Sequence, residues 1–267
     1  MSCSASPAAA TKTWRLSLPA DAPLFPRAAN GRLELVPYLM AGYPDRHRSI
    51  ENGRRMAGAG VAALEIGIPF SDPLADGPVI QKAGQAALEG GLTVGGAIEI
   101  AAAISGRAAL VFMSYINPIL AYGPDRFAAD ASSAGVAALI VPDLPVEEAE
   151  ALKPVFRQAG LDTVFLVAPT STDERIQRIC AASTGFVYCV TLTGITGVRA
   201  DLPAGLDALL GRVRARTELP VAAGFGISRP EHIAALIGHA DAAVVGSALV
   251  AADDPLPLVE ELLAACG

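Results

Sequence analysis

The stretch AALEIGIPFSDPLADGP, residues 62–78, begins as an apolar strand and becomes a turn crowded with Pro, Asp and Gly. It contains three carboxylates, Glu65, Asp72 and Asp76. A short apolar run bounded by turn residues is typical of a strand buried on both faces, as in a parallel sheet. Polar groups at the carboxyl end of such a strand lie where α/β proteins place their chemistry.

The same pattern repeats along the chain. Segments with helical character separate the apolar runs, and two helices fit between the second and third runs, at residues 78–90 and 93–105. The eight runs are residues 33–40, 62–68, 108–115, 137–143, 162–169, 185–191, 219–225 and 241–247. Eight strands alternating with helices predict the α/β class and a single (β/α)8 TIM barrel, with an extra helix between strands 2 and 3. A doubly wound open sheet is the alternative, although no GxGxxG motif follows the first run.

Length and composition fit one domain. The chain has 267 residues, and barrels of this kind run to about 250 residues as one domain. No apolar run reaches about 18 residues without a charge or a breaker, so we predict no membrane span. The net charge of −7 argues against binding of nucleic acid. The four cysteines form no CxxC pair, which favours a reducing, cytoplasmic location.

Residues 1–30 differ from the rest of the chain. They contain several Pro, Ser and Ala residues, three basic residues and one acid, Asp21. We expect a poorly ordered N-terminal extension, followed by the barrel over residues 31–267. A transit peptide is the alternative that this composition leaves open.

Glu65 stands inside an apolar strand, where a carboxylate is costly to bury unless it is paired or protonated. It is either a structural Glu in a hydrogen-bond network or a general acid/base with an elevated pKa. Asp76 follows in a loop long enough to fold back over the barrel mouth, so the two acids could flank one substrate. Asp72 and Asp76 also suit turns, and we favour the turn role for Asp72.

Two glycine-rich loops follow the last two predicted strands. In barrels, the loops after strands 7 and 8 often bind phosphate. Backbone N–H groups at glycines approach an anion closely, and a serine adds its hydroxyl. The candidates are Gly224, Gly226, Gly246 and Ser247. Ordinary tight βα turns are the alternative.

The segment TLTGITGVRADLP, residues 191–203, is long and polar, as expected of a lid or of a plain surface loop. Tyr188, in the strand before it, can point its hydroxyl into the barrel. No Lys is predicted at a strand end, which argues against Schiff-base chemistry. The three His residues do not cluster in the predicted elements, which argues against a metal site. Metal-free acid/base chemistry on a small phosphorylated substrate remains.

The segment LEIGIPFSDPLADGPVIQ, residues 64–81, closely resembles the signature of the tryptophan synthase α subunit family. The resemblance extends in family order and spacing from about residue 33 to the C-terminus. The other motifs are LVPYLMAGYPD (35–45), FMSYINPI (112–119), VPDLPVEE (141–148), VYCVTLTGITGVR (187–199), VAAGFGIS (221–228) and VVGSALV (244–250). Pro23 and Pro26 interrupt the region where the family usually has a short helix under the barrel, so the sequence leaves open how the barrel floor is closed.

The resemblance implies retro-aldol cleavage of indole-3-glycerol phosphate to indole and glyceraldehyde 3-phosphate, a step in L-tryptophan biosynthesis. It implies that Glu65 protonates the indole C3 carbon and helps to take the glycerol hydroxyl proton. It also implies that Asp76 receives or stabilises the indole N–H proton.

The same resemblance supplies the substrate contacts. It implies that Tyr188 lines the site, that Thr196 is a lid residue ordering Asp76, and that Gly197, Gly226, Gly246 and Ser247 hold the phosphate. Tyr38 and Tyr115, which stand within two of the family motifs, complete the substrate-binding candidates together with Gly224.

The family further implies a partner, the tryptophan synthase β subunit, in an α2β2 assembly. Loop 68–77 and the stretch from Asn117 would face it. The β subunit carries pyridoxal phosphate, so no cofactor is expected in this chain. A stand-alone lyase that releases free indole, and a non-catalytic barrel that binds a phosphorylated ligand, are the competing hypotheses.

Overall fold

We describe the fold from a computed structural model, which covers residues 23–28, 31–190, 205–224 and 226–267. The predicted lid, residues 191–203, lies outside these residues, as do Thr196 and Gly197. The first 22 residues lie outside them too.

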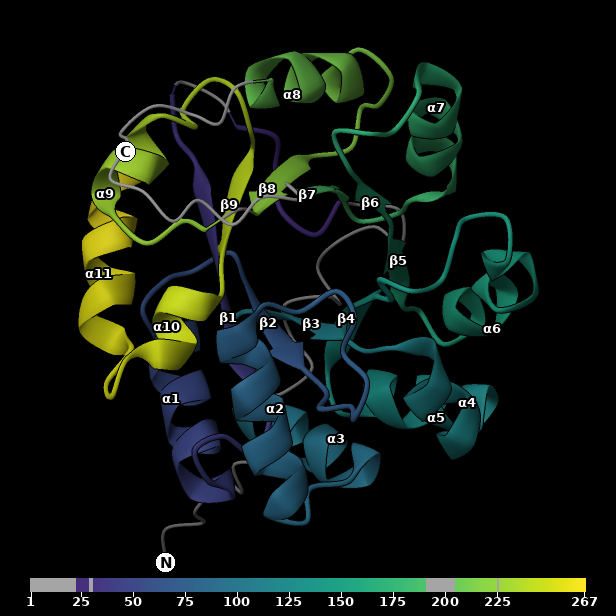
Figure 1. The fold of residues 1–267 in the computed structure, drawn as a ribbon, viewed down its shortest axis with the longest axis vertical. Helices are drawn as coiled ribbons and strands as arrows, with labels where there is room; N and C mark the ends of the chain where they lie inside the picture. Colours follow the sequence, from purple (N-terminus) through teal and green to yellow (C-terminus); the bar gives the residue numbers. More distant parts are fainter. Residues whose placement is uncertain (1–22, 29–30, 191–204, 225) are drawn as a thin grey trace, which may run out of the picture.

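All strands of the described residues join one parallel sheet (Figure 1). They are β1 (Glu34–Met40), β2 (Ala63–Gly67), β3 (Ala109–Met113), β4 (Val136–Ile140), β5 (Asp162–Val164), β6 (Leu166–Val167), β7 (Val187–Val190), β8 (Val221–Gly224) and β9 (Ala242–Val245). The strand order is β5-β4-β3-β2-β1-β9-β8-β7-β6. β1 therefore lies beside the last strand of the chain as well as beside β2.

The predicted fifth strand, residues 162–169, closes the barrel. It is interrupted at Phe165, so that its first part is β5 and its second part is β6. β5 pairs with β4, whereas β6 pairs with β7. The two ends of the strand order are thus consecutive pieces of one segment, and the prediction of a (β/α)8 barrel is confirmed.

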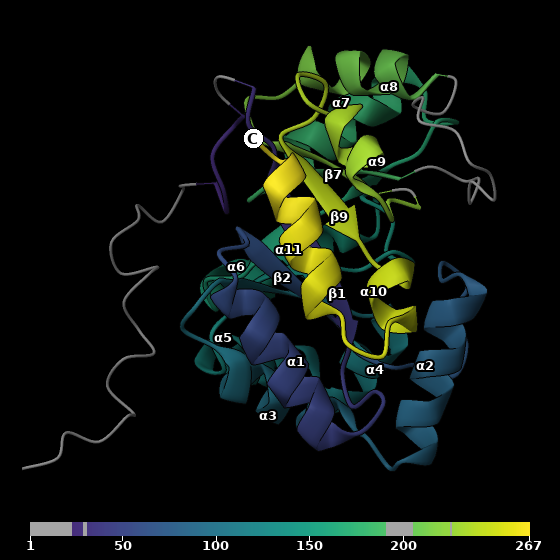
Figure 2. The same ribbon diagram turned by 90° about the vertical axis from the view of Figure 1, so that its left-hand side faces the viewer.

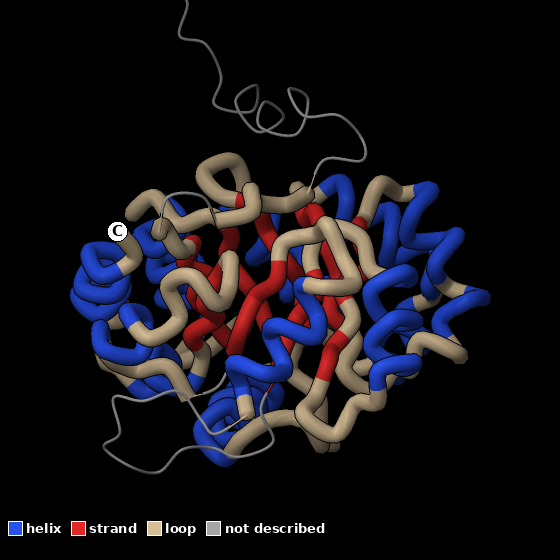
Figure 3. Tube along the Cα trace, turned by 90° about the horizontal axis from the view of Figure 1, so that it is seen from above, coloured by secondary structure: helices blue, strands red, loops and turns tan. Residues whose placement is uncertain are grey.

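Helices cover the outside of the sheet, as the view from above shows (Figure 3). They are α1 (Arg46–Gly58), α2 (Pro78–Glu89), α3 (Val94–Ile104), α4 (Ile116–Tyr122), α5 (Pro124–Ser133), the 3-10 helix η3 (Ala149–Ala151), α6 (Lys153–Gln158), α7 (Asp173–Ala182), α8 (Leu206–Arg214), α9 (Pro230–Ala234), α10 (Ser247–Ala251) and α11 (Leu256–Ala265). Asp45, Thr93 and Thr172 cap α1, α3 and α7 by accepting hydrogen bonds from backbone N–H groups. α1 and α11 lie side by side (Figure 2).

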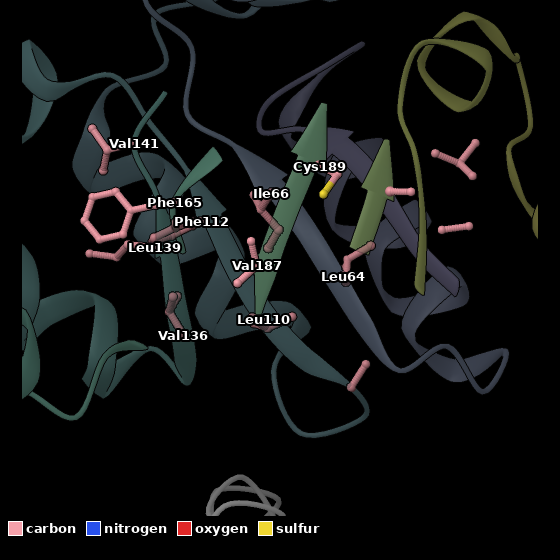
Figure 4. Close-up of a cluster of buried hydrophobic side chains, with 14 of the residues drawn as sticks. Leu64, Ile66, Leu110, Phe112, Val136, Leu139, Val141, Phe165, Val187 and Cys189 are labelled. Carbon is pink, nitrogen blue, oxygen red and sulfur yellow. The ribbon is translucent and has the colours of Figure 1, made fainter. Parts of the chain in front are cut away.

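Strand alternation divides the apolar side chains into two cores. Leu64 and Ile66 of β2 point outward and pack with side chains such as Leu110 and Phe112 in the layer between strands and helices (Figure 4). Ala63, from the same strand, belongs to the core inside the barrel. Because successive side chains of a strand point to opposite faces, Glu65 shares the inward face with Ala63.

The floor of the barrel is closed by residues 23–28. Leu24 and Phe25 are buried and belong to the inner core. The Leu24 N–H donates to the Gly185 carbonyl at 3.3 Å, and the Ala28 N–H donates to Asp241 Oδ1 at 2.8 Å. This segment, which the sequence assigns to the N-terminal extension, therefore packs as part of the barrel. It does so without a helix, because side-chain burial and these two hydrogen bonds hold it.

No single helix in the described ranges is long and apolar enough to cross a membrane. α2 and α3 pass that test only as a pair, and they are bent by 105° at their break. Ile98, Ile100 and Ile104 of α3 pack into the outer core.

Candidate active site

Glu65 lies at the centre of the inward-facing side chains of β2. Its neighbours across the ladder are Tyr38 on β1 and Val111 on β3. It is only 2% exposed, and its Oε2 atom has no hydrogen-bond partner among the described residues. Burial, and then the nearby charge of Asp76, raise the pKa of Glu65 to about 8. Glu65 is therefore a protonated carboxylic acid at neutral pH, able to give up a proton.

Asp76 reaches the same site from the loop between β2 and α2. Its backbone N–H donates to the Pro73 carbonyl at 3.1 Å, and Gln81 Nε2 donates to the Asp76 carbonyl at 2.9 Å. Burial raises the pKa of Asp76 to about 6, and hydrogen bonding from the Tyr115 side chain opposes that rise. Asp76 is thus mostly ionised at neutral pH. Two carboxyl groups whose pKa values are separated in this way are suited to act as acid and base.

Three tyrosines surround the two acids. Burial is the main cause that raises the pKa of Tyr38, Tyr115 and Tyr188, and the charge of Asp76 raises each further. The charge of Glu65 also raises the pKa of Tyr38 and of Tyr188. The structure therefore places all three tyrosines from the sequence analysis beside the two acids.

Tyr115 also holds the loop that carries Asp76. Its hydroxyl accepts a hydrogen bond from the Ala75 N–H at 2.9 Å, and its ring lies 5.4 Å from that of Phe70. Both partners belong to loop 68–77. Since Tyr115 immediately precedes α4, it ties this loop to the turn that follows β3.

Two glycines make room for the tyrosines. A Cβ atom on Gly67 would collide with the Tyr38 ring and hydroxyl, and one on Gly224 would collide with those of Tyr188. The sequence analysis chose Gly224 only for phosphate binding and did not choose Gly67. A glycine inside a strand often marks such a close approach, and that signal could have identified Gly67.

The candidate phosphate residues lie at the ends of two adjacent strands. Gly224 is the last residue of β8, and Gly226 follows with a φ of 52°, in the left-handed region that glycine adopts without strain. Gly246 follows β9 and precedes Ser247, the exposed first residue of α10. β8 and β9 pair in parallel, so these four residues come to one edge of the barrel.

Asp72 stays outside the site. It is exposed, its carboxylate accepts a hydrogen bond from Ser71 Oγ, and its carbonyl accepts one from the Leu74 N–H at 3.0 Å. These bonds agree with the turn role. Within the ranges that the structure describes, no three His, Cys, Asp or Glu side chains gather as a metal site would require.

Comparison with known proteins agrees with this geometry. The sequence model of the family described as "Tryptophan synthase alpha chain" matches residues 25–255. The chain is 49% identical to the tryptophan synthase alpha chain of Roseiflexus sp. (strain RS-1) over 225 residues, which cover 83% of this chain and 86% of that relative.

Solved structures give the same result. Tryptophan synthase from Mycobacterium tuberculosis matches with a TM-score of 0.84 and 40% sequence identity, over 89% of this chain and 93% of that chain. Tryptophan synthase subunit alpha from Legionella pneumophila str. Paris matches with a TM-score of 0.79 and 32% identity, over 88% of this chain and 92% of that chain.

Proposed function

The chain belongs to the tryptophan synthase alpha chain family of lyase-type enzymes in tryptophan biosynthesis, and we propose that it cleaves indole-3-glycerol phosphate to indole and glyceraldehyde 3-phosphate. The observation that carries this proposal is the pair of inward-facing acids with separated pKa values. Glu65, with a pKa of about 8, is protonated at a pH at which Asp76, with a pKa of about 6, is ionised.

The protons balance in two steps. Protonated Glu65 gives its proton to indole C3 while ionised Asp76 accepts the N1 proton, which forms the indolenine tautomer. The Glu65 carboxylate then takes the proton of the glycerol hydroxyl next to C3. The bond between C3 and that carbinol carbon breaks, its electron pair returns to the indole ring, and Asp76 returns the proton to N1. Both acids end in their starting states.

The surroundings of Glu65 support this role. The buried Oε2 atom of Glu65 finds no hydrogen-bond partner among the described residues, which costs free energy unless a ligand supplies one. Tyr38, Tyr115 and Tyr188 line the site as substrate-binding side chains. Because they are buried against the acids and remain protonated, they add no charge that would compete with the developing charges of the reaction.

We assign phosphate binding to backbone N–H groups at Gly224, Gly226 and Gly246 and to Ser247. Their position at one edge of β8 and β9 supports this assignment. Family resemblance adds Gly197 and, as a lid residue, Thr196; both lie outside the described residues.

We assign the face around loop 68–77 and α4 to the tryptophan synthase β subunit, in an α2β2 assembly. In this family the pyridoxal phosphate belongs to the β subunit. Two of the three large apolar side chains that the described residues expose lie on these segments: Leu74, 92% exposed, and Leu120, 51% exposed. Exposed apolar side chains rimmed by polar ones mark interaction surfaces.

We further propose that the barrel domain runs from the floor segment at residue 23 to the C-terminus, behind an N-terminal extension. Family membership supports a cytoplasmic location. Cys180, Cys189 and Cys266 are unpaired, which fits a reducing compartment.

The test is release of indole from indole-3-glycerol phosphate by wild type and Glu65→Gln, with and without a tryptophan synthase β subunit. We expect slow release by the wild type alone, strong acceleration by the β subunit, and no release by Glu65→Gln in either case. Fast release that does not respond to the β subunit would indicate the stand-alone lyase. No release by the wild type in any condition would leave the non-catalytic barrel.

A further inference from the structure

At the floor of the barrel, the inward-facing side chains of the strands are too small to fill the interior. Six of the strand residues in this core are alanines: Ala63, Ala109, Ala137, Ala138, Ala222 and Ala242. Close-packed interiors leave few voids, so another group must occupy the space that short side chains leave. Here that group comes from outside the sheet, as Leu24 and Phe25 of the floor segment.

The ring of Phe25 begins a row of aromatic contacts that leads toward the acids. Phe25 lies 5.1 Å from Phe186, ring centroid to ring centroid, and Phe186 lies 6.4 Å from Tyr188. Both distances fall in the range where aromatic pairs attract each other. Phe186 immediately precedes β7 and Tyr188 is the second residue of that strand, and both pack in the inner core of the barrel.

Each end of this row is held in place. At the floor, the Leu24 N–H donates to Gly185, the residue before Phe186, so the floor segment is bonded directly beside the second ring. At the other end, the Tyr188 side chain occupies the space above Gly224 that a Cβ atom would fill. Tyr188 therefore has Phe186 on one side and Gly224 on the other.

We propose that Phe25 and Phe186 are positioning residues that hold Tyr188 between Phe186 and Gly224, beside Glu65. Phe25 acts through Phe186 and touches neither acid. The inference rests on the proposed function for its kinetic consequence, since Tyr188 matters to cleavage as a wall of the substrate site. It makes Phe25, at the floor of the barrel, part of the active-site support.

The kinetic test compares Phe25→Leu with Leu24→Ala in the chain assembled with a β subunit. Phe25→Leu keeps an apolar plug but removes the ring. We expect kcat to fall on the order of tenfold, because small displacements of positioning groups cost rate, while KM stays within about twofold, since the phosphate contacts lie at the opposite end of the barrel. Leu24→Ala removes as much floor packing without touching the aromatic row, so it is expected to lower thermal stability and keep kcat.

A double-mutant cycle tests whether Phe25 acts through Tyr188. In a Tyr188→Ala background the ring that Phe25 positions is already gone, so Phe25→Leu is expected to cause no further loss of kcat. An additive loss, an unchanged kcat in Phe25→Leu, or an equal loss in Leu24→Ala would overturn the proposal. If Phe25→Leu does not fold, Phe25→Met provides the same comparison with a more adaptable side chain.

A spectroscopic measurement separates this proposal from the proposed function. The near-ultraviolet circular dichroism that Tyr188 contributes is the difference between chains with and without Tyr188→Phe. Phe25→Leu is expected to shrink that difference, and Leu24→Ala to preserve it, even if the chain did not cleave indole-3-glycerol phosphate. An undiminished Tyr188 signal in Phe25→Leu would overturn the positioning role by itself.

Discussion

At the scale of single residues, the proposed chemistry depends on Glu65 staying protonated while Asp76 is ionised. Burial is the largest cause of the raised pKa of both groups. Glu65 lies in the wall of the barrel and Asp76 on a half-buried loop, so desolvation raises the pKa of Glu65 further. The order of the two pKa values thus follows from where the chain carries each residue.

The first prediction concerns pH. The proposed reaction needs protonated Glu65, so kcat/KM is expected to fall as pH rises through about 8. It also needs ionised Asp76, so kcat/KM is expected to fall as pH decreases through about 6. The measurement is the pH profile of kcat/KM for indole release. A rate that stays flat through either pKa would contradict the assigned roles.

The second prediction uses Tyr115 to test whether the fall of kcat/KM at low pH, the acid limb of the profile, reports Asp76. Hydrogen bonding from Tyr115 lowers the pKa of Asp76, so Tyr115→Phe raises that pKa and shifts the acid limb to higher pH. The variant also loses the bond from the Ala75 N–H, and we expect kcat to fall about tenfold as the loop loosens.

The matched control for Tyr115→Phe is Tyr122→Phe. It removes a tyrosine hydroxyl that donates to Asp130 at 2.7 Å, away from the acids. Tyr122→Phe is expected to leave both kcat and the pH profile of kcat/KM unchanged. An acid limb that does not move in Tyr115→Phe would mean that it reports the substrate phosphate, which also titrates near pH 6.

At the scale of secondary-structure elements, β8 leaves space at Gly224 for the Tyr188 side chain, besides pairing with its neighbouring strands. Gly224→Ala would place a methyl group where the Tyr188 hydroxyl lies, so we expect kcat to fall at least tenfold with displacement of that side chain. Adding Tyr188→Phe to Gly224→Ala relieves part of the collision and is expected to restore part of the packing, seen as a higher melting temperature than for Gly224→Ala alone.

Gly211→Ala is the control for this glycine. Gly211 lies in α8, and a Cβ atom there would meet nothing within 4 Å. Because alanine favours a helix over glycine by about 1 kcal/mol, Gly211→Ala is expected to be neutral or stabilising. Equal losses of activity in Gly211→Ala and Gly224→Ala would argue against a specific contact with Tyr188.

The fourth prediction concerns Leu74, in the loop between β2 and α2. Leu74→Ser removes the most exposed large apolar side chain of the described residues. It is expected to weaken binding of the β subunit by roughly 1–3 kcal/mol, about 5- to 150-fold in Kd. Titration of β-subunit binding by calorimetry measures this. Glu174→Ser, at an exposed position on α7, is the control. Unchanged affinity in Leu74→Ser would place the partner on another face.

At the scale of the whole molecule, one buried carboxylate joins the floor segment to the last strands. Asp241 is fully buried; Oδ1 accepts from the Ala28 N–H and from Arg214 at 3.1 Å, and Oδ2 accepts from the Val221 N–H at 2.8 Å. A buried charge of this kind needs all of its partners, because each lost bond leaves a polar group unsatisfied.

The fifth prediction follows from this arrangement. Asp241→Ala is expected to lower the free energy of unfolding by about 3–5 kcal/mol, because it leaves Arg214 and two backbone N–H groups without their acceptor. Urea denaturation measures the change. Glu218→Ala removes an exposed carboxylate that pairs with Arg27, and is expected to change the free energy by less than about 1 kcal/mol. A comparable loss in both variants would contradict the special role of the buried group.

The sequence by itself predicted the strands, their parallel arrangement and the barrel, and it selected Glu65 and Asp76 as the candidate acid/base pair. These follow from patterns a few residues long: apolar runs bounded by turns, and acids at fixed positions within and after one run. It also identified the three tyrosines through the family motifs. Local patterns suffice here because strand burial and helix capping depend on neighbouring residues.

Only the tertiary structure decided how the barrel is closed and how the site is supported. The split of residues 162–169 between two neighbouring strands, the floor segment, and the space above Gly67 and Gly224 all depend on contacts across the fold. Ala28 and Asp241, for example, lie 213 positions apart. The pKa values of Glu65 and Asp76 also depend on the tertiary structure. Desolvation is set by every group packed around a carboxyl and not by its neighbours in the chain.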